Sequence, residues 1–155
     1  MQLNKFSIFA DYFQFYLMDD AEIDDTSEIW TDKALDIKLG MTPHALAVGT
    51  MRNVDVDVIV EVVDAEPEIN LDEWDYISKG YISLPSGRCI VMGCTDAIED
   101  ATRLEVKPGN YAALAMAKGI NSIVAEWEPA NDLYRVVIWA SDSKEYFAVK
   151  EYQNT

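Results

Sequence analysis

The clearest pattern along the chain is an alternation of valines and acids between positions 54 and 63. Valines occupy the even positions from Val54 to Val62, whereas Asp55, Asp57 and Glu61 occupy odd positions. Successive side chains of a strand point to opposite faces, so this pattern predicts a strand with one apolar and one acidic face. A strand that is buried on only one side is typical of antiparallel sheets.

Nine further short runs fit the same scheme, and turn residues separate them at intervals of roughly ten positions. The ten expected strands span residues 5–10, 13–18, 45–50, 54–63, 76–84, 89–92, 102–106, 111–117, 133–140 and 145–152. The residues at 84–87 suit a type I turn, and those at 107–110 suit a type II turn with Gly109 in third place. Because each one-sided sheet must bury its apolar face against another layer, the pattern predicts a mainly antiparallel, two-layer β-sandwich.

The periodicity changes between Trp30 and Leu39, where Trp30, Ala34 and Ile37 would share one side of a helix. We expect a helical insert of one or two turns that ends at Gly40. The sequence contains no repeat or linker, and its 155 residues are expected to form a single domain.

Charge narrows the classes of function. The chain has 28 acids and 12 bases, a formal net charge of −16, and this charge repels nucleic acids and anionic membranes. No apolar stretch approaches the roughly 18 to 20 residues of a spanning helix. Lys5 is the one base before the first apolar run, and Asp11 interrupts that run, which argues against a secretory signal. We therefore expect a cytoplasmic protein that does not bind nucleic acid directly.

The residues that carry most enzyme chemistry are scarce. His44 is the single histidine, and no glycine pattern indicates a phosphate loop, so neither catalytic residues nor a cofactor is expected. Cys89 and Cys94 lack further metal-ligating partners and are expected to be free thiols.

The acidic run from Asp19 partly resembles a calcium-binding EF-hand loop, with Asp20, Glu22 and Asp24 at its first, third and fifth positions. However, Asp25 stands where such a loop needs glycine, and Thr31 stands where it needs glutamate. We expect no metal site of this kind, and weak binding of calcium stays open.

Two acidic blocks are the strongest candidates for a binding surface. Residues 19–36 hold eight acids and one lysine, and residues 55–75 hold nine acids and no base. Fixed carboxylates can imitate a phosphodiester backbone and attract a basic cleft, and neighbouring aromatic residues can anchor an interface. The candidate partner-binding residues are Asp19, Asp20, Glu22, Asp24, Asp25, Trp30, Asp32, Asp72, Glu73, Trp74 and Asp75.

Several short motifs resemble the competence protein J family. They are Tyr12-Phe13-Gln14-Phe15, Trp30-Thr31-Asp32-Lys33-Ala34, Ala45-Leu46-Ala47-Val48, Arg52-Asn53, Leu84-Pro85-Ser86-Gly87 and Pro108-Gly109-Asn110-Tyr111. The likeness spans roughly residues 5–120. It implies a stoichiometric protein inhibitor of a nuclease, in which the residues around Trp30 and Arg52 either hold the fold or contact the partner.

The leading hypothesis is a non-enzymatic, acidic inhibitor or immunity-type protein that occludes a basic partner such as a nuclease. An alternative is a β-sandwich module that binds a small molecule or carbohydrate in a groove lined by some of its four Trp and eight Tyr residues. An enzyme that uses carboxylates, a structural subunit and a merely solubilising surface are further alternatives. The oligomeric state is left open.

Overall fold

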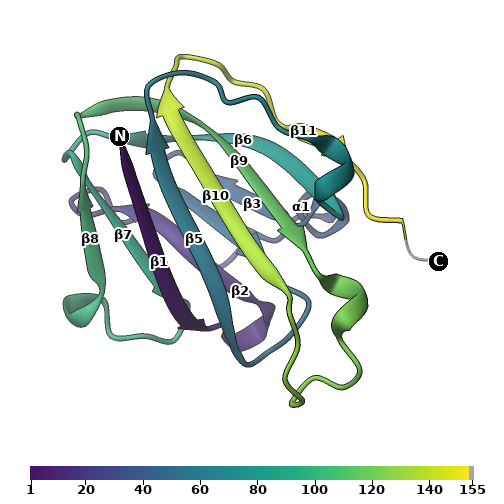
Figure 1. Ribbon diagram of the computed structural model, residues 1–155. Helices are drawn as coiled ribbons and strands as arrows, with labels where there is room; N and C mark the ends of the chain where they lie inside the picture. Colours follow the sequence, from purple (N-terminus) through teal and green to yellow (C-terminus); the bar gives the residue numbers. More distant parts are fainter. Residues whose placement is uncertain (154–155) are drawn as a thin grey trace.

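The computed structural model describes residues 1–153, which form two β-sheets packed face to face (Figure 1). The six strands of the first sheet are, in spatial order, β1 (Gln2–Phe9), β5 (Asp55–Val63), β10 (Leu133–Ala140), β9 (Gly109–Lys118), β6 (Tyr76–Leu84) and β11 (Phe147–Lys150). Its neighbouring strands are antiparallel except β5 and β10, which are parallel.

The second sheet has five antiparallel strands. In spatial order they are β3 (Leu39–Thr42), β4 (Ala45–Gly49), β2 (Gln14–Asp19), β7 (Arg88–Gly93) and β8 (Thr102–Glu105). The helices are α1 (Asp32–Ile37) and four short 3₁₀ turns, η1 (Asp11–Phe13), η2 (Leu71–Glu73), η3 (Ile98–Asp100) and η4 (Ile120–Ser122). The predicted mainly antiparallel, two-layer arrangement is confirmed.

The main core lies between the two sheets. Val56, Val58 and Val60 of β5 are at most 2% exposed and belong to this core. The prediction that the valine face of this strand is buried is therefore confirmed. Phe15 of β2 and Tyr134 of β10 approach from the two layers and are fully buried.

The predicted helical insert of one or two turns is confirmed as α1, but it does not extend to Gly40. Thr31 caps α1 by accepting a hydrogen bond from the backbone N–H of Ala34 at 3.1 Å, which leaves Trp30 outside the helix. Lys38, with φ of +65°, ends the helix in the left-handed conformation. Gly40 instead belongs to β3, a strand that the sequence pattern missed. A Cβ atom on Gly40 would lie 2.7 Å from the carbonyl oxygen of Ile29, so glycine permits a close chain approach there.

Both predicted turns connect one sheet to the other. Residues 84–87 lead from β6 to β7, and the Gly87 N–H donates to the Leu84 carbonyl at 3.2 Å. Residues 107–110 lead from β8 back to β9. The type II prediction for this second turn is wrong, because Gly109 has φ of +149° instead of about +80°.

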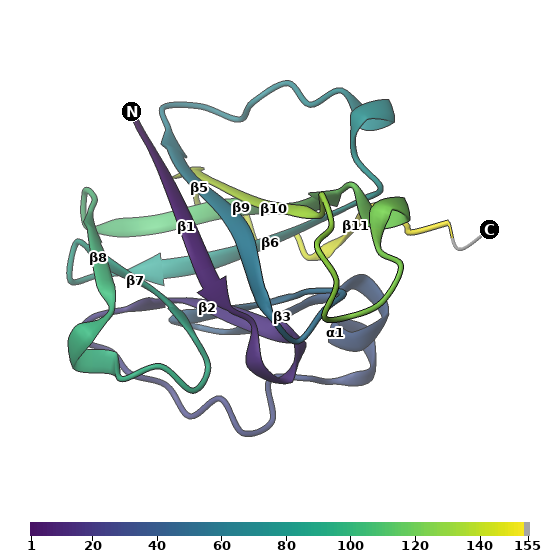
Figure 2. The same cartoon turned by 60° about the horizontal axis from the view of Figure 1, so that its bottom comes forward.

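The acidic segments 20–31 and 64–75 cover the outer faces of different sheets. Ile29 and Trp30 pack on the second sheet, and Ile69 and Trp74 pack on the first. Figure 2 shows the two segments on opposite sides of the sandwich, the first below and the second above. Each segment therefore packs on its own sheet through apolar side chains, and the acids of the two segments lie on different surfaces of the molecule.

Among residues 1–153, no helix has the length and apolar character needed to cross a membrane.

Candidate partner-binding site

Asp19 is buried at the end of β2 and organises the loop that follows. Its carboxylate accepts hydrogen bonds from the backbone N–H groups of Ala21 and Glu22, at 3.0 and 2.8 Å, and from the backbone and hydroxyl of Ser86. Burial opposes the charge, but these hydrogen bonds outweigh it and lower the pKa of Asp19. Asp19 therefore lies beneath the surface and supports the fold.

Most other acids of this segment also have partners within the chain. The Asp20 carboxylate lies 2.7 Å from Nε of Arg88 and 3.1 Å from Nε of Arg103. Asp24 lies 3.0 Å from Nδ1 of His44 and also accepts its backbone N–H. These contacts fix the course of the loop.

Asp24 and Asp25 accept two further hydrogen bonds within the chain. The Thr42 hydroxyl donates to Asp24 at 2.7 Å, and Asp25 accepts the backbone N–H of Ser27 at 2.9 Å. Glu22 and Asp32 are exposed. Within the first acidic block, the outward-facing candidates are thus Glu22, Asp25 and Asp32.

The structure brings the four candidates at 72–75 together on the opposite side of the sandwich. Trp74 is buried against the first sheet, and the Lys118 ammonium lies 4.8 Å from its ring centre and 2.8 Å from the Glu73 carboxylate. Asp75 accepts the backbone N–H of Ile120 at 3.0 Å, whereas Asp72 is exposed. This cluster does not join Trp30 and Asp32 in one site.

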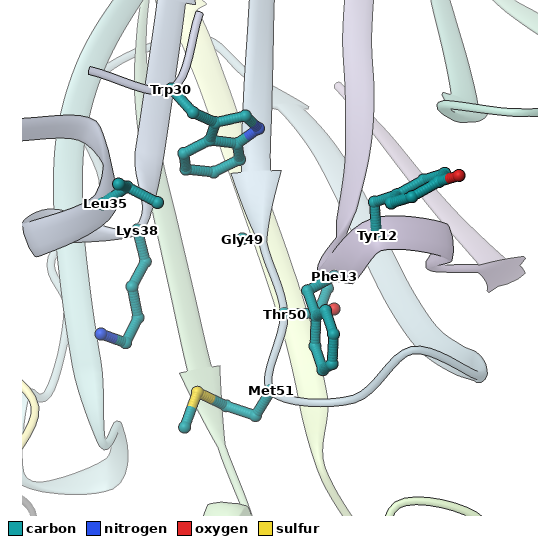
Figure 3. A pocket seen from close by; sticks show the side chains of 8 residues that line it. All are labelled: Tyr12, Phe13, Trp30, Leu35, Lys38, Gly49, Thr50 and Met51. Carbon is teal, nitrogen blue, oxygen red and sulfur yellow. The ribbon is translucent and has the colours of Figure 1, made fainter. Parts of the chain in front are cut away.

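Trp30 instead lines an open groove of about 460 Å³ at one end of the sandwich (Figure 3). The indole Nε1 donates to the Gln14 side chain at 2.7 Å, which fixes the ring at the groove wall. The groove is lined by Tyr12, Phe13, Trp30, Leu35, Lys38, Gly49, Thr50 and Met51. Figure 3 shows the backbone of Gly49, Thr50 and Met51 as its floor, with Trp30 and Leu35 on one side and Tyr12 and Phe13 on the other.

The groove wall contains two consecutive aromatic residues in the left-handed conformation. Tyr12 has φ of +56° and Phe13 has φ of +61°, a region that L-residues seldom occupy because of the clash of Cβ with the backbone. The bend is held by a hydrogen bond from Thr50 N–H to the Phe13 carbonyl at 2.9 Å. As a result, both aromatic side chains are exposed to solvent.

Arg52 follows the groove floor in sequence and is 6% exposed, so it holds the fold instead of facing a partner. Its guanidinium pairs with Asp132 and also donates to the backbone carbonyls of Glu126 and Glu128, at 3.2 and 2.9 Å. Trp127 lies between these two carbonyls, and its side chain is 80% exposed. The buried arginine therefore fixes a loop that presents an indole to solvent.

Sequence reasoning missed several residues of this end of the molecule as candidates, namely Tyr12, Phe13, Leu35, Met51 and Trp127. The sequence did contain a signal for Tyr12 and Phe13, because Asp11 interrupts the apolar run at the point where the chain bends before β2. Trp127 lies in a stretch with no strand or helix periodicity, which offered no comparable signal.

Within residues 1–153, no three His, Cys, Asp or Glu side chains cluster as a metal site would require. The run at 20–31 forms no such cluster because several of its carboxylates are directed to different backbone and side-chain partners. Cys89 is buried and free, and Cys94 is free as well.

No protein-family model and no curated protein matches the chain in sequence. The solved structures do contain similar folds, and one is the crystal structure of ComJ from Bacillus subtilis. The chain shares the fold of ComJ. The TM-score is 0.67 at 12% identity, over 91% of this chain and 96% of ComJ. The resemblance to the competence protein J family is thereby confirmed at the level of fold, and it extends beyond residues 5–120.

ComJ is described as an inhibitor of the DNA degrading activity of NucA. A second similar structure, described as crocagin biosynthetic gene J, has a TM-score of 0.61 at 17% identity over 90% of this chain and 97% of that one. As with ComJ, the likeness covers both sheets, so it concerns the whole sandwich and not an isolated motif.

Proposed function

We propose that the chain is a non-catalytic, cytoplasmic protein inhibitor that binds a basic nuclease and covers its DNA-binding surface. The observation that carries this proposal is the likeness in fold to ComJ over nearly the full length of both chains. ComJ acts on a nuclease, and a nuclease must offer a positively charged surface to its DNA substrate.

The distribution of charge supports the same proposal. Within the described chain, six of the twelve Lys and Arg side chains form ion pairs with its own acids. These bases therefore offer little positive charge to a partner, while many acids stay exposed and set the surface potential. Such a surface attracts a basic protein at long range and accelerates its association at low salt.

The proposal assigns two roles to the candidate acids. Glu22, Asp25 and Asp32 on one side and Asp72 on the other are exposed and contribute to the field that attracts the partner. Asp19, Asp20, Asp24, Glu73 and Asp75 have partners in the chain and shape the loops that carry the exposed acids.

A direct test uses the purified chain immobilised on a resin and incubated with native lysate at about 0.05 M and about 0.5 M salt. We expect a basic nuclease to be recovered at low salt and reduced in amount at high salt. The recovered nuclease should stop degrading linear double-stranded DNA when an equimolar amount of the free chain is added. Recovery of no basic protein under either condition, or a recovered nuclease that stays fully active, would overturn the proposal.

The groove supports a second candidate function, the binding of a small molecule or carbohydrate. Its volume of about 460 Å³ falls in the range of small-molecule sites, and Trp30, Tyr12 and Phe13 supply flat aromatic surfaces. A screen of oligosaccharides and metabolites by calorimetry would support this candidate through saturable binding that Trp30→Ala abolishes. A screen without saturable binding would count against it.

A further inference from the structure

Exposed apolar side chains gather at the end of the sandwich that contains the groove. Four of the eleven large apolar side chains that are exposed in the described chain belong to this end. They are Tyr12, Phe13, Leu35 and Trp127. Trp127 and Tyr12 are 80% and 71% exposed, values typical of side chains that have no neighbours to pack on. Gathered exposed apolar groups commonly mark an interaction surface.

The loop with Trp127 is tied to the groove through Arg52. Arg52 directly follows Met51 at the end of the groove floor, and its guanidinium holds the carbonyls on both sides of Trp127. The backbone N–H of Met51 also donates to the Tyr134 hydroxyl at 2.9 Å. The end of the groove floor and the Trp127 loop are therefore held by the same group of buried side chains.

The rim of this surface is acidic. Asp32 and Asp36 are exposed on α1, and Glu126 and Glu128 flank Trp127. The two lysines of this region are engaged elsewhere.

The Lys33 ammonium donates to the Tyr146 carbonyl at 2.6 Å and lies 4.3 Å from the centre of its ring. The Lys38 ammonium lies 5.4 and 5.8 Å from the ring centres of Tyr76 and Tyr152, and in Figure 3 it points away from Tyr12 and Phe13. Both ammonium groups are thus directed toward the C-terminal segment, and the four acids outnumber these two lysines, so the net charge of the rim is negative.

We infer that this end of the sandwich is the docking surface for the basic partner, with the groove and Trp127 as apolar anchors and the four acids as the rim. The inference rests on the proposed function and adds the location of the contact. The matching surface on the partner is an apolar side chain that enters the groove, flanked by Lys or Arg residues that pair with the acidic rim. An apolar centre with a charged rim is the common anatomy of tight protein interfaces.

The groove is preorganised for such an insertion. A Cβ atom on Gly49 would lie 3.4 Å from the Trp30 ring and 3.3 Å from Cβ of Lys38, so glycine keeps the floor open. The left-handed bend at Tyr12 and Phe13 stores strain in the free protein and directs both rings outward. A backbone that is already fixed before binding loses less entropy when the complex forms.

The test compares the affinities of variants for the nuclease recovered on the immobilised wild-type chain. Trp127→Ala, Leu35→Ala and Tyr12→Gly are each expected to weaken binding by about tenfold or more, the effect of removing an interface anchor. Leu3→Ala is the matched control for Leu35→Ala, since the two leucines are 59% and 61% exposed and Leu3 lies near the start of β1, away from the groove. This control should change the affinity by less than about twofold.

Tyr12→Gly separates binding from folding. Glycine adopts positive φ without strain, so this variant should unfold at a temperature equal to or higher than that of the wild type while it loses affinity. Wild-type affinity in all three variants, Trp127→Ala, Leu35→Ala and Tyr12→Gly, would overturn the docking surface and leave the proposed function intact. If the wild type recovers no nuclease, both fail together. Sedimentation that shows a dimer disrupted by Trp127→Ala would also overturn the inference, because a second copy would then occupy this surface.

Discussion

The Arg52 guanidinium and the Asp132 carboxylate form a buried ion pair through two hydrogen bonds, of 2.6 and 3.1 Å. The two residues are 80 positions apart, and the pair joins the end of the groove floor to the start of β10. The Tyr134 hydroxyl completes the network by donating to Asp132 at 2.9 Å. The carboxylate also raises the pKa of Arg52 through these hydrogen bonds, so the guanidinium stays protonated.

Removal of one partner from this pair should be costly. We expect Arg52→Met to lower the free energy of unfolding by about 3 to 5 kcal/mol, because a buried carboxylate is left without its counter-charge. Urea denaturation measures the loss. The double variant Arg52→Met, Asp132→Leu should recover much of it, since no buried charge remains. Equal losses in the single and double variants would contradict this account.

Asp19 should make the stability depend on pH in acid. Its pKa is lower in the folded chain than in the unfolded chain, so the unfolded state binds the extra proton first. This contribution is complete above the unfolded pKa of about 4 and is lost as the pH falls through the folded pKa.

Asp19→Asn should therefore cost about 1 to 3 kcal/mol at pH 7, and its difference from the wild type should shrink in acid. Urea unfolding at a series of pH values from 7 to about 2.5 gives the comparison. Asp72→Asn serves as the control, because this carboxylate is exposed. A constant difference between Asp19→Asn and the wild type over the whole range would refute the role of Asp19.

The two thiols should differ in reactivity. Burial raises the pKa of Cys89 to about 12, and the side chain is fully enclosed, so the reactive thiolate is both scarce and inaccessible. Burial also raises the pKa of Cys94, but this residue is only partly enclosed. With a thiol reagent at pH 8, mass spectrometry should find Cys94 labelled slowly in the native protein and Cys89 labelled only after denaturation. Labelling of native Cys89 at the rate of Cys94 would show that β7 opens readily.

The sequence was most informative for β5, a strand that buries one of its two faces in the core. The alternation through β5 predicts both the strand and the side that enters the core, since a register shift of one residue would bury Asp55 and Asp57. The strand β3 was missed because its four residues include Gly40 and directly follow a helix. Its pairing with β4 depends on a close chain approach that no local pattern encodes.

The candidate site was only partly predictable for a related reason. The composition of the two acidic blocks is visible in the sequence, but their placement on opposite sides depends on which sheet each segment covers. The exposure of Trp127 likewise depends on Arg52 and Asp132, which are distant in sequence. Contacts between remote residues decide these features, so periodicity within a short window does not reveal them.

The position of the acidic segments predicts which acids contribute to the affinity for the partner. The segments 20–31 and 64–75 cover opposite sides of the sandwich. A partner that docks at the groove lies beside α1, which contains Asp32 and Asp36, whereas Asp64 and Asp72 belong to the segment on the other side. Coulomb interactions across water are screened over about 10 Å at 0.1 M salt. Acids near the interface should therefore contribute to affinity, and distant acids should contribute mainly to the general field.

Two double variants with the same change of charge separate these effects. Asp32→Asn, Asp36→Asn should weaken nuclease binding by about three- to thirtyfold at 0.1 M salt and flatten its salt dependence, whereas Asp64→Asn, Asp72→Asn should change it by less than about twofold. Surface plasmon resonance at several salt concentrations measures both, and most of the loss in the first variant should appear in the association rate. Equal losses in the two variants would mean that only the net charge matters, and a larger loss in the second would place the partner on the face covered by residues 64–75.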